Sequence, residues 1–275
     1  MVHDQRSALS TYMSGLLSAG RVVFAGREAQ QTIGIGRGAF LDAAERLQRR
    51  KYLLNPRQDF YVVVPPQFAA WGAPPPSWYI DDLMRHEGEP YYVGLLKAAE
   101  LHGAAHQAVM EFQVVAGKRL PKIRAGRNLI VFYYRKDMGA AAPGIEDKKT
   151  DTGSMKVSSA ALTALDLLRY PQAAGGIDNV ATVLADLGRE IDAGQLAELA
   201  AKAECPVVQR LGYLLDQLGH GARAAPMHAV LEARGSVRWT ELDRKQARDP
   251  DFAPAPQERN ARWRVIVRRA PEVDE

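Results

Sequence analysis

The first 65 residues carry an order of helix and strand signals that limits the fold more than any other part of this chain. Apolar residues recur at helical spacing over residues 7–17, and Gly20 follows at the position where a helix would end. The apolar run at residues 21–24 is long enough for one short strand, and residues 27–33 suit a short second helix. The chain is therefore expected to begin as helix, strand and helix.

A third helix and a two-stranded hairpin complete this pattern. Residues 37–50 place apolar side chains on one helical face, and the glycine-rich run 34–38 separates this helix from the second. Two apolar runs, residues 52–54 and 60–64, flank a predicted turn at residues 55–58. This order is that of a winged helix-turn-helix, which usually places its third helix in the major groove of DNA. Small winged domains also bind proteins, so a protein-interaction adaptor is the alternative function.

The formal charge of the chain is concentrated in this region. The whole chain has 36 Lys+Arg and 32 Asp+Glu residues, a net charge of +4. Residues 1–66 hold nine basic and five acidic residues, so they account for the entire excess, while the remainder is neutral. Basic groups at both ends of the third helix and in the hairpin favour contact with phosphates. The candidate DNA-binding residues are Arg27, Arg37, Gln48, Arg49, Arg50, Lys51 and Arg57.

The rest of the chain predicts a larger mixed domain at residues 67–275, entered through a proline-rich joint at residues 67–76. The predicted fold class is α/β in the broad sense (α+β), with a winged helix-turn-helix domain at residues 1–66. The predicted helices after residue 66 are 78–86, 91–103, 158–170, 177–191, 193–204, 207–218 and 226–234. The predicted strands are 109–115, 128–134, 237–240 and 262–269. Residues 139–154 are predicted to be a loop.

A second basic cluster lies between and just after two of these strands. No acidic residue interrupts the basic ones from residue 118 to residue 136. Such a run attracts an acidic protein surface or a phosphate backbone. A solvated loop and strand edge is an equally good interpretation, because Lys on an edge discourages aggregation. The candidate partner-binding residues of this basic strip are Lys118, Arg119, Lys122, Arg124 and Arg127.

The sequence offers no catalytic motif. The glycine-rich run 34–38 lacks the preceding strand and βαβ unit of a dinucleotide fingerprint. His102 and His106 have the spacing of a helical metal pair, but Gly103 lies between them and no zinc-protease glutamate accompanies them. Cys205 is the sole cysteine and has no basic cluster beside it in sequence, so nothing indicates a reactive thiolate. We predict a protein that is not an enzyme, with no catalytic residue, metal or cofactor.

The expected compartment is the cytoplasm. The N-terminal residues show no positively charged segment followed by an apolar core, as a secretory signal would. No run approaches the roughly 18 apolar residues of a membrane span. A single cysteine excludes an intramolecular disulfide and fits a reducing environment.

Four runs, at residues 47–66, 91–107, 156–171 and 209–219, resemble the AbiEi antitoxins of type IV toxin–antitoxin systems, and the similarity covers most of residues 5–240. The resemblance implies an N-terminal winged helix-turn-helix that represses its own operon and a C-terminal α/β domain tied to antitoxin activity. It also implies a separately encoded nucleotidyltransferase toxin of the AbiEii kind, which need not form a stable complex with the antitoxin. The signature of that toxin, Gly-Ser followed closely by paired acids, is absent here.

The expected function is therefore that of a DNA-binding autorepressor and antitoxin. The expected partners are operator DNA, with inverted repeats upstream of its own operon, and the cognate toxin. Because no coiled-coil seam is visible, we expect a monomer in solution.

Overall fold

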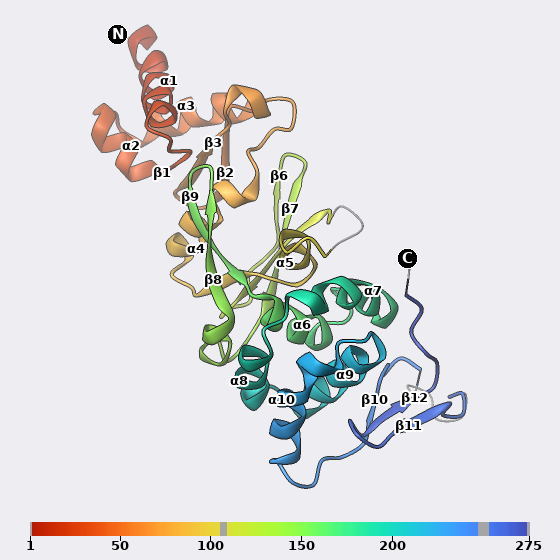
Figure 1. Ribbon diagram of the computed structural model, residues 1–275. Helices are drawn as coiled ribbons and strands as arrows, with labels where there is room; N and C mark the ends of the chain where they lie inside the picture. Colours follow the sequence, from red (N-terminus) through yellow and green to blue (C-terminus); the bar gives the residue numbers. More distant parts are fainter. Residues whose placement is uncertain (1, 105–108, 247–252, 274–275) are drawn as a thin grey trace. The chain divides into compact units, whose positions relative to one another are not determined.

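The computed structural model describes residues 2–104, 109–246 and 253–273, and the chain forms two compact units (Figure 1). The first unit contains Met1–Tyr91, Met110–Arg135 and Asp147–Lys156. The second contains Tyr92–Val109, Lys136–Glu146 and Val157–Glu275. The first unit thus joins the N-terminal region to segments from further along the chain. That residues 1–66 form a domain by themselves stays a prediction.

The predicted winged helix-turn-helix opens the first unit. Its elements are α1 (Val2–Ser18), β1 (Val23–Ala25), α2 (Gly26–Ile33), α3 (Arg37–Arg49), β2 (Leu53–Arg57) and β3 (Phe60–Val63). The three strands form an antiparallel sheet in the order β1-β3-β2. Leu9, Phe24, Phe40 and Tyr61 are buried in its core, where the rings of Phe24 and Tyr61 stack at 5.3 Å and Phe40 meets Tyr61 edge-on. The apolar face predicted for the third helix is therefore the face that packs.

The hairpin turns later than predicted, at residues 58–59 instead of 55–58. The side-chain amide of Asn55 donates to the carbonyl oxygens of Arg57 (2.7 Å) and Phe60 (2.9 Å), which holds β2 against β3 beyond Asn55. The register of the two strands shifts around Pro56, which cannot donate a ladder hydrogen bond. The residues predicted to form the turn, 55–58, therefore mostly form an irregular part of strand β2.

A six-stranded sheet has the order β6-β7-β5-β4-β9-β8. Its strands are β4 (Tyr91–Val93), β5 (Glu111–Ala116), β6 (Ile123–Ala125), β7 (Asn128–Tyr134), β8 (Ile145–Thr150) and β9 (Gly153–Ser158). β5 and β7 are parallel and paired from Glu111↔Leu129 to Ala116↔Tyr134, β6 and β7 are antiparallel, and β4 and β9 are parallel. Along the chain, β4, β8 and β9 each pass from one unit to the other.

Two predictions in this region are wrong. The predicted loop at residues 139–154 contains the 3₁₀ helix η3 (Gly139–Gly144), all of β8 and the first two residues of β9. β8 lies at the edge of the sheet and most of its side chains are exposed, so it lacks the apolar alternation that marks a half-buried strand. The predicted helix at residues 91–103 begins as β4, and only α5 (Leu95–Leu101) is helical.

The proline-rich segment predicted as a joint is packed within the first unit. It contains the 3₁₀ helices η1 (Pro66–Phe68) and η2 (Pro76–Trp78) and leads into α4 (Ile80–Glu87). Ala73 is fully buried, and the Asn128 side chain donates to the Pro74 carbonyl oxygen (3.0 Å). The Arg127 backbone N–H donates to the Trp71 carbonyl oxygen (3.0 Å). The segment therefore lies against the β6–β7 hairpin.

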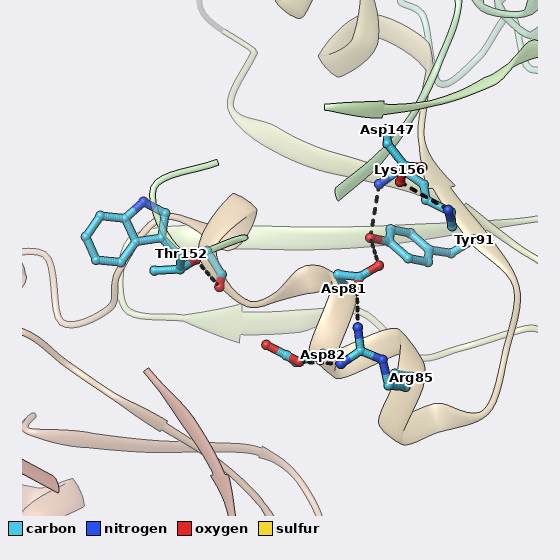
Figure 2. A network of polar contacts seen from close by, with 8 residues as sticks. Asp81, Asp82, Arg85, Tyr91, Asp147, Thr152 and Lys156 are labelled. Carbon is cyan, nitrogen blue, oxygen red and sulfur yellow. Dashed lines mark hydrogen bonds and ion pairs between the residues drawn. The ribbon is translucent and has the colours of Figure 1, made fainter. Parts of the chain in front are cut away.

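Figure 2 shows the polar contacts that fix α4 within the first unit. Asp81, in the first turn of α4, accepts hydrogen bonds from the Tyr91 hydroxyl (2.9 Å) and the Arg85 guanidinium (2.5 Å). The Lys156 backbone N–H donates to the Tyr91 hydroxyl (3.2 Å), and the Lys156 ammonium pairs with Asp147 (3.1 Å). Burial raises the pKa of Tyr91 well above its ordinary value, so its hydroxyl remains a neutral donor to Asp81.

The second unit consists mainly of helices. They are α6 (Ala160–Arg169), α7 (Ile177–Leu187), η4 (Gly188–Glu190), α8 (Ala193–Lys202), α9 (Cys205–Gln217) and α10 (Gly221–Glu232). Ser159 caps α6 by accepting from the Leu162 N–H (3.3 Å), and α6 lies within the helix predicted at residues 158–170. α10 begins five residues before the predicted start and contains Pro226 inside it.

A small sheet of β10 (Thr240–Glu241), β11 (Glu258–Asn260) and β12 (Val265–Val267) follows, in the order β10-β12-β11. β11 was missed by the sequence analysis. Trp263 is fully buried and donates its indole N–H to Asp216 (2.6 Å). Gly212 of α9 leaves the space for this ring, because a Cβ at Gly212 would lie 2.2 Å from it. None of the helices in the described ranges has the length and hydropathy needed to cross a membrane.

Candidate nucleic-acid interface

The outward face of α3 carries exposed basic side chains beside an exposed apolar one. Arg37 occupies the first helical position, after Gly36, which provides no side-chain cap. Leu41 is 45% exposed on this helix, although leucine is usually buried. A helix N-terminus and an arginine favour negative charge, and an apolar side chain can contact a thymine methyl group. The face of α3 that does not pack in the core therefore presents cationic side chains and a leucine, together with the exposed acids Asp42 and Glu45, to solvent.

The other end of α3 holds more basic side chains. Arg49 pairs with Glu45 (2.6 Å), and the Arg50 guanidinium lies 5.2 Å from the centre of the exposed Tyr52 ring. Lys51 is exposed, and Gln48 is half-buried. The sequence analysis missed Arg46, which is exposed on the same helix. Its place three residues before Arg49 was the signal that could have found it.

Arg27 lies at the start of α2 with 88% of its side chain exposed. Its backbone N–H donates to the Asp59 carboxylate (3.2 Å), which reaches it from the turn of the hairpin. The Asp59 carboxylate also lies 4.0 Å from the Arg27 guanidinium. The start of α2 is thereby joined to the wing, and the Arg27 side chain extends into solvent.

Arg57 does not lie with the exposed basic residues. Its Nε is 2.5 Å from a Glu87 carboxylate oxygen, and its NH2 group donates to the Pro121 carbonyl oxygen (2.7 Å). Its guanidinium also lies 5.8 Å from the centre of the Phe132 ring. This side chain is engaged in holding the hairpin against α4 and the six-stranded sheet.

The five residues of the basic strip are all exposed. In β6 the side chains of Ile123 and Ala125 are buried while Arg124 points outward, which is the alternation of a half-buried strand. Arg119 lies 5.1 Å from the centre of the Tyr134 ring. Arg135, which continues this run in the sequence, is buried instead.

The structure brings one end of the basic strip close to the end of α3. A Cβ on Gly72 would lie 3.4 Å from the Gly126 Cα and 4.0 Å from the Lys51 side chain. Trp71, which precedes Gly72, is 49% exposed, and its carbonyl oxygen accepts from the Arg127 N–H. Lys51, Trp71 and Arg127 therefore neighbour one another, although they are far apart in the sequence.

The structure describes the contacts of His102 and Cys205, which the sequence analysis considered as a possible metal ligand and a possible reactive thiol. His102 hydrogen-bonds the Ser158 carbonyl oxygen (2.8 Å), and His106 lies outside the described residues. In the described part of the chain, no three His, Cys, Asp or Glu side chains gather as metal ligands would. Cys205 does have a basic neighbour, because the Arg234 guanidinium donates to its sulfur (3.1 Å). Arg234 also donates to the carbonyl oxygens that end α8, including that of Ala203, so its contacts are those of a helix cap.

Comparison with known proteins finds a family model that matches part of this chain and a solved structure with a similar fold. Residues 92–217 match the family model described as the AbiEi antitoxin C-terminal domain. The crystal structure of the Rv2827c protein from Mycobacterium tuberculosis superposes with a TM-score of 0.67 at 18% identity, covering 95% of this chain and 91% of that chain. No curated protein sequence matches. The family match confirms the resemblance found in the sequence, and the structural match confirms the fold class.

Proposed function

Because residues 92–217 match the AbiEi antitoxin C-terminal domain, we propose that this chain is an antitoxin that also represses its own operon by binding operator DNA. The AbiEi family is regulatory and not enzymatic, and its members act as antitoxins. The proposal adds three elements to that role. They are sequence-selective DNA binding by α3, autorepression, and a nucleotidyltransferase as the toxin.

The observation that carries DNA binding is the exposed face of α3. Among the described residues, no carboxylate forms an ion pair with Arg37, Arg46, Arg50 or Lys51. These cations can therefore meet phosphates without first breaking an internal pair. Arg37 stands where a recognition helix contacts base edges, and Arg50 and Lys51 stand where such a helix leaves the groove. Arg57 is not among the proposed phosphate contacts, because its guanidinium is engaged inside the unit.

The basic strip supports a second contact with a negatively charged partner. Arg127 neighbours Lys51, so it belongs to the surface that we assign to DNA. Lys118, Arg119 and Lys122 lie in the connection between β5 and β6, and Arg124 lies on β6. We assign these four residues to the antitoxin function, facing either an acidic toxin surface or the nucleic-acid substrate of the toxin. The chain acts as a monomer in solution under this proposal.

Two readouts on the same full-length variants test the assignment. A helix variant replaces Arg37, Arg46 and Arg50 by Ala, and a strip variant replaces Lys118, Arg119, Lys122 and Arg124 by Glu. The helix variant should lose repression of an operator reporter and still rescue cells that express the toxin. The strip variant should repress normally and fail to rescue. Because all seven side chains are exposed, both variants should fold.

The opposite outcomes reject specific parts of the proposal. If the helix variant represses fully, α3 does not bind the operator, and the winged domain is better explained as a protein-binding adaptor. If the strip variant rescues fully, the basic strip has no part in antitoxin function.

A further inference from the structure

The second unit contains a pocket that takes no part in the functions proposed above. It has a volume of about 420 Å³ and is lined by the end of α6, the first turns of α7 and α9, and the segment after β10. Leu168, Ile177, Val207 and Leu242 give it apolar walls. The segment after β10 lies beyond the residues that match the AbiEi domain. The volume is in the range of small-molecule sites.

Arg210, in α9, is a buried cation at this pocket that donates hydrogen bonds to neutral oxygen atoms. Its side chain is 6% exposed, and it donates to the Glu241 carbonyl oxygen (2.8 Å) and to the Thr240 hydroxyl (3.1 Å). The Glu241 carboxylate is occupied by Arg268, with contacts of 2.9 and 3.1 Å. The Asp243 and Glu241 carboxylates interact electrostatically with Arg210, but no carboxylate of the described residues lies within ion-pair distance of it. Buried charges are normally paired, so a bound anion would supply the direct ion-pair partner that this guanidinium lacks among the described residues.

The side chains that line the pocket have a net positive charge. Burial and the neighbouring Arg244 lower the pKa of Arg210 to about 10, although the Asp243 and Glu241 carboxylates act in the opposite direction, so Arg210 remains charged at neutral pH. Arg169 pairs with Glu204, and its buried Nε lies 4.0 Å from the Asp166 carboxylate without a hydrogen bond among the described residues. Including Lys245 and Asp243, the pocket is lined by four cationic and two anionic side chains.

A helix terminus adds to this potential. α7 begins at Ile177 after Gly176, and both residues line the pocket. Gly176 has a φ of 101° and gives the first N–H groups of α7 no side-chain cap. The Asp178 carboxylate in this turn is held by Arg269 (2.5 Å) and by the Glu272 N–H (3.0 Å). The start of α7 therefore presents backbone donors and a positive dipole end near the pocket.

We propose that this pocket binds a phosphorylated small molecule, with the phosphate on Arg210 and Arg244 and an apolar or planar body against Val207 and Leu242. Guanidinium groups match the oxygens of a phosphate in pairs, and a phosphate monoester carries close to two negative charges at neutral pH. The surplus of two cationic side chains in the lining fits that charge better than the single charge of a carboxylate.

Thermal unfolding and calorimetric titration of the full-length protein test this proposal. The probes are phenyl phosphate and 5′-AMP, with phenol, adenosine and benzoate as matched ligands that lack the phosphate. Phenyl phosphate or 5′-AMP should raise the melting temperature and bind at least about tenfold more tightly than the matched ligands, which corresponds to 1.4 kcal/mol or more. If neither phosphate probe binds, or if benzoate binds as tightly as phenyl phosphate, the proposal is wrong.

Variants locate the binding. Arg210→Met removes a buried charge that has no ion pair, and such replacements by apolar side chains are often tolerated. The double variant Arg244→Glu with Lys245→Glu changes exposed side chains and should fold in any case. Both should abolish phosphate binding. The charge-matched control Arg189→Glu with Arg259→Glu, at exposed sites outside the lining, should bind as the unaltered protein does. Phosphate binding that survives in the Arg244 and Lys245 variant would place the ligand elsewhere.

Discussion

The Nε of Arg57 lies 2.5 Å from a carboxylate oxygen of Glu87, and their side chains are only 18% and 16% exposed. This ion pair joins the hairpin of the winged domain to α4. The same guanidinium reaches the carbonyl oxygen of Pro121 in the connection between β5 and β6. A residue predicted as a phosphate contact thus has a clear structural role within the first unit.

Replacing Arg57 by Met should destabilise the protein and leave DNA binding by the folded fraction almost unchanged. Removing one partner of a largely buried pair leaves an uncompensated carboxylate, which costs about 2–4 kcal/mol. Urea unfolding would measure the loss, with Arg85→Met as the control, because Arg85 is 70% exposed. If the Arg57→Met variant has normal stability and a shallower salt dependence of DNA binding, Arg57 contacts phosphate and the structural role is wrong.

Replacing Arg50 and Lys51 by Ala should weaken binding to every DNA sequence to a similar degree. Each lost phosphate contact should flatten the slope of log affinity against log salt by about 0.9. Fluorescence anisotropy at several salt concentrations gives this slope. Arg21→Ala is the matched control, because Arg21 is exposed in the same domain but pairs with Glu28 at 3.3 Å. If the slope is unchanged in the double variant, Arg50 and Lys51 do not contact the phosphate backbone.

Replacing Gly212 by Ala should be strongly destabilising, although alanine favours helices. The added Cβ would lie 2.2 Å from the Trp263 ring, which is fully buried and cannot move without opening the contact between α9 and the small sheet. Overpacking of this kind costs about 1–3 kcal/mol or more. Gly15→Ala in α1, where no atom lies within 4 Å of the new Cβ, should instead stabilise by about 1 kcal/mol. Similar melting temperatures for the two variants would contradict the packing described here.

The ion pair between Asp178 and Arg269 should make stability depend on pH in the acid range. Burial alone would raise the pKa of Asp178, but the hydrogen bonds from Arg269 and the Glu272 N–H outweigh it and lower the pKa below the ordinary 3.8. A carboxyl group whose pKa is lower in the folded state stabilises the protein at pH values above its unfolded-state pKa. This stabilisation is lost as the pH falls through the folded-state pKa. The difference in unfolding free energy between the unaltered protein and Asp178→Asn should therefore be constant near neutral pH and shrink below 3.8. A difference that is independent of pH would rule out this linkage.

The winged domain was predictable because its signals are local. Phe40 and its apolar neighbours repeat at helical spacing, and Gly34, with a φ of 73°, ends α2 where the glycine-rich run begins. Ser159, a residue type common at helix N-caps, precedes α6 and caps it. Local patterns failed for β6, whose alternation spans only three residues, and for β8, whose side chains are mostly exposed and so leave no alternating pattern.

Contacts between distant segments were beyond the sequence analysis. Nothing near Arg57 in the sequence indicates that Glu87 and Pro121 engage it. The same holds for Arg234 beside Cys205 and for Arg210, whose pocket is assembled from four separate segments. The charge of a side chain could be read from the sequence, whereas its partner depended on the tertiary fold.

The most direct test of the central claim is a competition between two DNA duplexes for the full-length protein. One duplex carries the DNA upstream of the gene that encodes this chain, and the other is a shuffled sequence of equal length and composition, both at 0.15 M salt. The upstream duplex should bind at least about 10³-fold more tightly, as specific sites typically do, and Arg37→Ala should remove most of that preference. Equal affinity for the two duplexes would contradict the account, because the exposed face of α3 would then read no sequence.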